Sequence, residues 1–129
     1  MSRDKVQFSD LIGKTLVSVT GSVGDERMTF TVSDNESYIL YHVQDCCETV
    51  KIEDICGDIN DLIGSPITQA EESTNDTDWP DDTTEDATYV ESFTWTFYRI
   101  ATMKGQIVVR WLGESNGYYS ESVDFAREL

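Results

Sequence analysis

The residues most capable of chemistry gather in one stretch of the chain, from His42 to Cys56. This stretch contains the single histidine and all three cysteines, which are Cys46, Cys47 and Cys56. Imidazole nitrogens and thiolates are the usual ligands of structural zinc, so His42, Cys46, Cys47 and Cys56 form the candidate metal site. Adjacent cysteines, however, point to opposite sides of a strand and converge only in a turn. The alternative is that one cysteine is an ordinary core residue and another lies in a loop.

The same histidine and cysteines could instead form a nucleophile–base pair. His42 would take the proton of Cys46 or Cys47, and Asp45 or Glu48 would orient the imidazole. The sequence contains no glycine-rich phosphate loop that would support catalysis. A hydrogen-bonded histidine at the end of a strand explains the residue equally well, and we predict a protein without catalytic activity.

Acidic residues dominate the chain, and their distribution is uneven. The 129 residues include 25 Asp and Glu against 9 Lys and Arg, for a formal net charge of −16. Between Lys51 and Arg99 there is no basic residue, and this gap contains 13 of the acids. Nucleic-acid affinity depends on Lys and Arg that neutralise phosphates, and an anionic membrane surface would repel the chain. A basic protein or a cation is therefore the expected partner.

Two groups of acidic residues are candidates for contact with a basic partner. Asp54, Asp58 and Asp61 have the i, i+4, i+7 spacing of one helix face, which would be either a negative stripe that imitates a phosphate backbone or simply a solvated face. The segment 74–88 is expected to be a flexible acidic loop, because its charge density cannot offset the entropy cost of ordering. The contact residues predicted in this loop are Asp76, Asp78, Trp79, Asp81 and Asp82. The tryptophan either anchors a partner or folds back onto the sheet.

Alternation of apolar and polar residues indicates strands over most of the chain. The predicted strands are 15–23, 27–33 and 37–43, which form a meander, then a short strand at 50–53, an extended segment at 66–73, and strands at 89–103, 106–112 and 119–125. Asn116-Gly117 predicts a hairpin between the last two. Helical spacing of apolar residues predicts short helices near residues 9–13 and 54–63. The prediction is one α+β domain over residues 1–129, with a mainly antiparallel sheet of six or seven strands and one or two short helices.

The longest predicted strand carries a row of large aromatic residues. Phe93, Trp95 and Phe97 fall on one side of it, and Thr94 and Thr96 fall on the other. We expect the aromatic row to belong to the core and not to a ligand-binding platform.

The cysteine count and the N-terminus indicate the cellular setting. Three cysteines are an odd number, which does not suit a disulfide scaffold, and the first residues contain no apolar signal core. No apolar run approaches the roughly 18 residues of a membrane span. We therefore predict a cytoplasmic protein whose cysteines are reduced.

Several uncommon sequence motifs follow one another along the chain. They are Asp45-Cys46-Cys47-Glu48, Glu53-Asp54-Ile55-Cys56-Gly57-Asp58, Asp61-Leu62-Ile63-Gly64-Ser65-Pro66-Ile67, Glu91-Ser92-Phe93-Thr94-Trp95-Thr96-Phe97-Tyr98, and Gly113-Glu114-Ser115-Asn116-Gly117-Tyr118-Tyr119-Ser120-Glu121-Ser122-Val123-Asp124-Phe125. Together they resemble a family of small acidic proteins of unknown function encoded by tailed bacteriophages and prophages. The resemblance runs from about Gly13 to the C-terminus, and it implies a phage origin and an intracellular setting but no particular activity.

The functional prediction follows from the charge and the missing catalytic motifs. We predict a small acidic binding protein that engages or inhibits a basic host or phage protein through its acidic surface. The concrete form of this prediction is inhibition of a nucleic-acid-binding host factor or a defence component. No cofactor is expected. The alternative is a metal-binding or small-ligand-binding module centred on His42, Cys46, Cys47 and Cys56.

Overall fold

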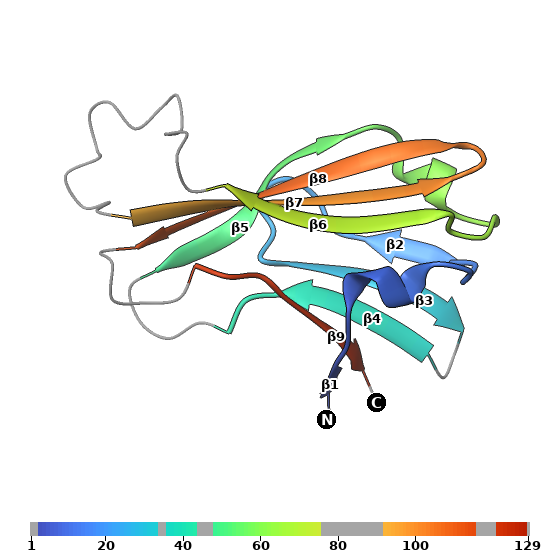
Figure 1. The fold of residues 1–129 in the computed structure, drawn as a ribbon, viewed down its shortest axis with the longest axis horizontal. Coiled ribbons are helices and arrows are strands. Elements are labelled where there is room, and N and C mark those ends of the chain that lie inside the picture. The colour runs from blue at the N-terminus through green and yellow to red at the C-terminus, as the bar shows by residue number, and fades with distance from the viewer. Residues whose placement is uncertain (1–2, 34–35, 44–47, 76–91, 116–120, 129) are drawn as a thin grey trace.

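Two antiparallel sheets pack face to face in the computed structural model of the chain (Figure 1). The structure describes residues 3–33, 36–43, 48–75, 92–115 and 121–128. These residues contain nine strands and two short 3-10 helices. Apolar residues from both sheets fill the space between them, which makes the fold a β-sandwich.

The first sheet contains five strands in the order β1-β9-β4-β3-β2. Their bounds are β1 Arg3–Lys5, β2 Ser18–Thr20, β3 Arg27–Ser33, β4 Glu36–Tyr41 and β9 Asp124–Glu128. The β2-β3-β4 part is the meander that the sequence predicts. The C-terminal strand lies between β1 and β4, so the two ends of the chain are neighbours in this sheet (Figure 1).

The second sheet contains four strands in the order β5-β8-β7-β6. Their bounds are β5 Thr49–Cys56, β6 Gln69–Asn75, β7 Ser92–Thr102 and β8 Gly105–Ser115. β7 and β8 form a long hairpin in full register. The hairpin predicted at Asn116-Gly117 is wrong, because β8 pairs with β5 and β7 whereas β9 belongs to the other sheet. Of the predicted flexible loop, Thr74 and Asn75 complete β6, and the rest lies outside the described residues.

The predicted α+β class is wrong, because the described residues form two antiparallel sheets and contain no α-helix. The helix expected over 54–63 begins inside β5, where Asp54 and Ile55 pair with the opposite strand β8. Gly57, at a φ of 111°, then turns the chain, and only four residues, Ile59–Leu62, form the 3-10 helix η2. The other short helix, η1 (Phe8–Leu11), is also 3-10. No helix of the described part is long and apolar enough to cross a membrane.

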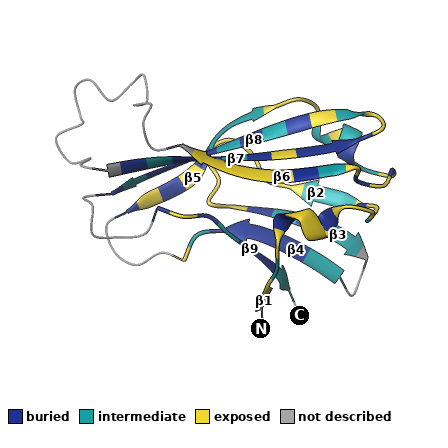
Figure 2. Cartoon of the chain, viewed as in Figure 1, coloured by how far each residue is buried: buried dark blue, intermediate teal, exposed yellow. Residues whose placement is uncertain are grey.

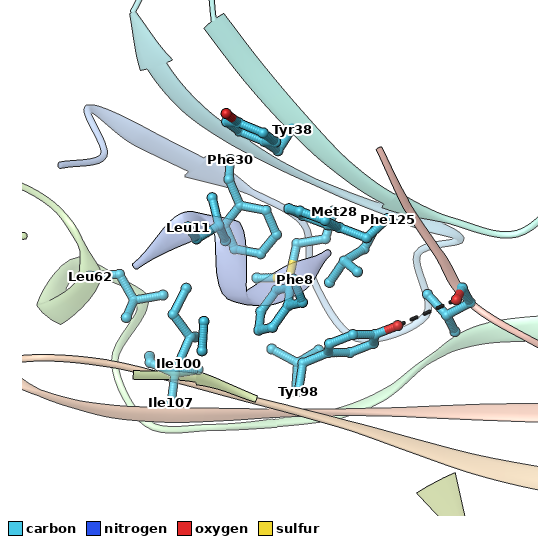
Figure 3. Close-up of a cluster of buried hydrophobic side chains, with 14 of the residues drawn as sticks. Phe8, Leu11, Met28, Phe30, Tyr38, Leu62, Tyr98, Ile100, Ile107 and Phe125 are labelled. Carbon is cyan, nitrogen blue, oxygen red and sulfur yellow. Dashed lines mark hydrogen bonds between the residues drawn. The ribbon is translucent and has the colours of Figure 1, made fainter. Parts of the chain in front are cut away.

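The main core lies between the sheets, and buried residues alternate with exposed ones along the first half of β5 (Figure 2). Its fully buried side chains include Leu11, Leu16, Met28, Phe30 and Leu40 on one side and Ile52, Tyr98, Ile100, Ile107 and Trp111 on the other. The helix η1 places Phe8 at the centre, with its ring 4.8 Å from that of Tyr98 and 5.2 Å from that of Phe125 between centroids (Figure 3). Such contacts between aromatic rings stabilise the packing of the two sheets on each other.

The aromatic row of β7 belongs to a separate apolar cluster on the outer face of the second sheet. Phe93 and Trp95 are buried there with Leu112, and Phe97 packs against them. The main core instead uses the opposite face of the same strand, which carries Tyr98. The row is therefore a core element, as predicted, but of this smaller cluster.

Candidate functional site

The histidine lies just past the end of β4, and its side chain is only 3% exposed. Its Nδ1 is 2.7 Å from the carbonyl oxygen of Ser122, and its Nε2 is 2.8 Å from a carboxylate oxygen of Glu48, whose side chain is fully buried. A carbonyl oxygen can only accept, so Nδ1–H of His42 must donate to Ser122. The hydrogen bond to Glu48 then needs one further proton, held either by Nε2 or by the carboxyl group.

This hydrogen-bonded pair joins segments that are far apart in the sequence. His42 follows β4 of the first sheet, Glu48 precedes β5 of the second, and Ser122 precedes β9. Both ring nitrogens are engaged and the imidazole is buried, so it does not reach an external substrate as a general base must. The geometry therefore favours a structural histidine over a nucleophile–base pair. Cys46 and Cys47 lie outside the described residues.

A second buried carboxylate, that of Glu121, lies at the same end of the sandwich. It accepts hydrogen bonds from the Thr94 hydroxyl at 2.8 Å and from the Ser115 hydroxyl. Its backbone and Cβ lie directly over Gly113 of β8, where an added Cβ would be 2.6 Å from the Glu121 carbonyl oxygen. Glu121 therefore ties β7 and β8 to the segment that leads into β9.

Sequence reasoning did not identify Glu121 as a site residue, although a signal was present. Glu121 shares one side of the alternating pattern with the apolar residues Val123 and Phe125. A carboxylate on an apolar face must be hydrogen-bonded when it is buried, as Glu121 is here. We name Glu121, Thr94 and Ser115, together with the His42–Glu48 pair, the polar bridge.

Cys56 does not join the other predicted zinc ligands. It ends β5 and is exposed, whereas His42 bonds Glu48 just before the start of that strand. Eight residues of extended chain separate Glu48 from Cys56, which corresponds to roughly 26 Å at about 3.3 Å per residue. His42 and Cys56 therefore do not share one metal centre. Within the described ranges, no three His, Cys, Asp or Glu side chains are grouped closely enough to hold a metal ion.

The thiol of Cys56 is exposed, yet its surroundings keep it protonated. Its Sγ donates to a carboxylate oxygen of Asp54 at 3.4 Å, and this hydrogen bond is the main cause of a raised pKa of the thiol. The thiolate is the reactive form of cysteine, so Cys56 is a poor nucleophile despite its exposure.

We predict that Asp54→Asn speeds alkylation of Cys56. The substitution removes the negative charge that disfavours the thiolate, so iodoacetamide should label Cys56 faster near neutral pH. Labelling is followed by mass spectrometry in a protein with Cys46→Ser and Cys47→Ser, so that one thiol remains. Glu26→Gln, an exposed change of equal charge, serves as the control. Equal rates for Asp54→Asn and the parent would contradict the assigned role of Asp54.

The three acids predicted to share a helix face have separate positions. Asp54 lies on β5, 4.0 Å from a guanidinium nitrogen of Arg110. Asp58 caps η2 by accepting from the Asn60 N–H at 3.0 Å, and Asp61 lies within that helix. The negative helical stripe is therefore not formed. The other predicted contact residues, Asp76, Asp78, Trp79, Asp81 and Asp82, lie outside the described residues.

An open cleft lies between the edge of the second sheet and the N-terminal segment. Its volume is about 540 Å³, and the residues that line it come from 5–9, from 70–72 of β6 and from 123–125. Phe8, Ala70 and Phe125 supply an apolar floor, and the carboxylates in its lining are those of Glu71, Glu72 and Asp124. We name this feature the β6 cleft.

A buried tyrosine hydroxyl lies near Glu72 and Asp124, two of the three carboxylates of the β6 cleft. Tyr98 points from β7 toward the segment leading into β9, where its hydroxyl is 3.4 Å from the Val123 carbonyl oxygen (Figure 3). Burial, then hydrogen bonding with Glu72, and then the neighbouring charges of Glu72 and Asp124 raise the pKa of Tyr98 well above its usual range. The hydroxyl therefore stays protonated.

The chain belongs to the family described as DUF7448, a domain of unknown function, whose model matches residues 9–125. This match confirms the predicted membership in a family without an assigned function. No curated protein and no solved structure matches the chain significantly.

Proposed function

We propose that this chain is a phage-encoded binding protein that engages a basic protein of the host or of the phage through its acidic surface. The observation that carries the proposal is the charge, −16 in total, of which −13 falls on residues 53–98. The electrostatic field of a surface with one sign of charge steers an oppositely charged partner toward it and speeds their association. The phage origin rests on the resemblance of the sequence motifs.

The positions of the basic residues support this proposal. Several are already engaged by acids: Lys14 lies 2.7 Å from Glu36, and Arg110 forms an ion pair with Glu53. With only 9 bases for 25 acids, most carboxylates have no basic residue to neutralise them. Repulsion between so many carboxylates keeps the folded protein soluble, and the same negative charge attracts a basic partner.

The concrete form that we propose is inhibition of a nucleic-acid-binding host factor or a defence component. Such a partner has a basic groove that neutralises phosphates. An acidic protein that enters this groove displaces the nucleic acid by competition. The buried imidazole and the hydrogen-bonded Glu121 are consistent with a protein that acts by binding.

The test begins with a partner captured from a bacterial lysate and continues with its association kinetics. We expect the association rate constant of the purified pair to fall between low and high salt, within the 10- to 1000-fold range known for electrostatic steering. Replacing Asp76, Asp78, Asp81 and Asp82 with Asn should slow association at low salt. Replacing Thr77, Thr83, Thr84 and Thr88 with Ala in the same segment should not. Rates that are insensitive to salt and to the Asp substitutions would contradict the proposal.

A further inference from the structure

The outer edge of β6 is unpaired among the described strands. β6 is the last strand of its sheet, and its main contacts within the described chain are with β7 and η1. Residues 71–74 of this strand are exposed (Figure 2). An edge strand directs alternate N–H and C=O groups away from the sheet, where another extended segment can pair with them.

The β6 cleft lies directly beside this open edge. Ala70 and Glu72 are opposite Ile100 and Tyr98 in the strand register, so their side chains lie on the core-facing side of the sheet. A strand added to β6 would place every second side chain on this same side, next to Glu72 and over the cleft. The edge offers backbone hydrogen bonds to an added strand, and the cleft selects which side chains that strand can carry, as in other cases of strand addition.

The chemistry of the cleft fits one kind of side chain. The floor formed by Phe8, Ala70 and Phe125 is apolar, and the carboxylates of Glu72 and Asp124 lie near it. Lysine and arginine combine an aliphatic stem with a positive head, so they match an apolar floor beside acidic groups. Lys5 of the chain itself is 3.8 Å from Asp124, but its side chain is 73% exposed and such a pair is weak. A basic side chain of a partner can therefore compete with Lys5.

Charge also decides between a partner strand and a second copy of this chain. The exposed residues of β6 include Glu71 and Glu72 and no base. Two β6 edges paired with each other would bring these carboxylates close together, and like charges on adjacent strands are destabilising. The same glutamates favour a basic strand, so the edge is protected against self-association and open to a partner.

We propose that β6 and the β6 cleft form the docking site for an extended basic segment of the partner protein. This segment adds a strand to β6 and places a lysine or arginine between Glu72 and Asp124. The inference rests on the proposed function and specifies where the contact is made and by what chemistry.

The probe for this docking site is a short, end-capped, fluorescently labelled peptide in which lysine alternates with threonine. We expect it to bind, and we expect the same peptide with glutamate in place of lysine not to bind. Residues with side chains on the same side of a strand also direct their N–H groups to the same edge. N-methylation of all lysines or of all threonines therefore blocks one edge at a time. Strand addition predicts that only one of the two methylated peptides loses affinity, by about tenfold or more.

The matching variants of the protein are Glu72→Gln and Asp124→Asn, with Glu26→Gln as the control of equal charge change. Each cleft variant should lower the affinity of the protein for the lysine peptide about tenfold, whereas Glu26→Gln should change this affinity less than twofold. Thermal unfolding of each variant verifies the fold, and Glu72→Gln alone suffices if Asp124→Asn is unstable, because Glu72 is exposed. If all three variants changed the peptide affinity equally, or if both methylated peptides lost affinity equally, the proposed docking site would be wrong. The peptide would then bind by nonspecific charge attraction.

Failure of the docking site and failure of the proposed function are distinguishable. If the lysine peptide does not bind while association with the captured partner still depends on salt and acidic charge, the docking site is overturned and the proposed function stands. If the partner associates without charge dependence, the proposed function itself is overturned.

Discussion

Replacing His42 with alanine is expected to lower the free energy of unfolding by about 3 kcal/mol, the cost of leaving buried polar groups without their hydrogen-bond partners. The substitution leaves the fully buried Glu48 without the 2.8 Å contact to Nε2 and the Ser122 carbonyl oxygen without the Nδ1–H donor. Because small proteins are stable by only about 5–15 kcal/mol, this is a large fraction of the total. Urea denaturation at neutral pH measures the change.

An exposed ion pair provides the control for this prediction. Lys5→Ala removes the 3.8 Å contact between Lys5 and Asp124, in which the lysine side chain is 73% exposed. Solvent screening makes such pairs worth at most about 1 kcal/mol. If His42→Ala cost no more than Lys5→Ala, the polar bridge would not be a main connection between the two sheets.

Strand content was predictable from the sequence because it depends on local alternation. The prediction of 27–33 matches β3 (Arg27–Ser33), that of 37–43 overlaps β4 (Glu36–Tyr41), and that of 89–103 contains β7 (Ser92–Thr102). The pairing of the strands was not predictable in the same way. β9 pairs with β1 and β4, which are distant in the sequence, and nothing local in 119–125 distinguishes that arrangement from a hairpin with β8.

The false helix over 54–63 has an equally physical origin. Ile55, Ile59 and Leu62 have helical spacing, but hydrogen bonding of β5 to β8 continues through Cys56. Gly57 then takes a left-handed conformation that ends the strand. Tertiary pairing overrides a periodicity that spans so few residues.

The candidate sites were predictable only in part for the same reason. Glu48 was one of two acids expected to orient His42, and it does bond the imidazole. The other acceptor, Ser122, is 80 residues away in the sequence and left no local signal. The β6 cleft is assembled from residues 5–9, 70–72 and 123–125, so it exists only once the two sheets have packed together.

Gly113→Ala is expected to destabilise the protein by about 3 kcal/mol, from overpacking and from the loss of hydrogen bonds to the Glu121 carboxylate. The new Cβ would lie 2.6 Å from the carbonyl oxygen of Glu121 and 2.7 Å from its Cβ, and neither atom can rotate away. The backbone at 121–122 must therefore shift. This shift moves the Glu121 carboxylate away from Thr94 and Ser115 and moves the carbonyl oxygen of Ser122 away from His42.

Gly24→Ala separates this clash from the general cost of replacing a glycine. Gly24 has a φ of 96°, which costs an alanine about 1–2 kcal/mol, but no atom lies within 4 Å of the added Cβ. Gly113→Ala and His42→Ala both disrupt the polar bridge, so the double variant should lose less stability than the sum of the two single losses. The difference should be about 0.5 kcal/mol or more, as is usual for coupled residues. Gly24→Ala combined with His42→Ala should be additive within about 0.5 kcal/mol. Additivity of Gly113→Ala with His42→Ala would show that Glu121 and His42 act independently, and the polar bridge would then be two separate contacts.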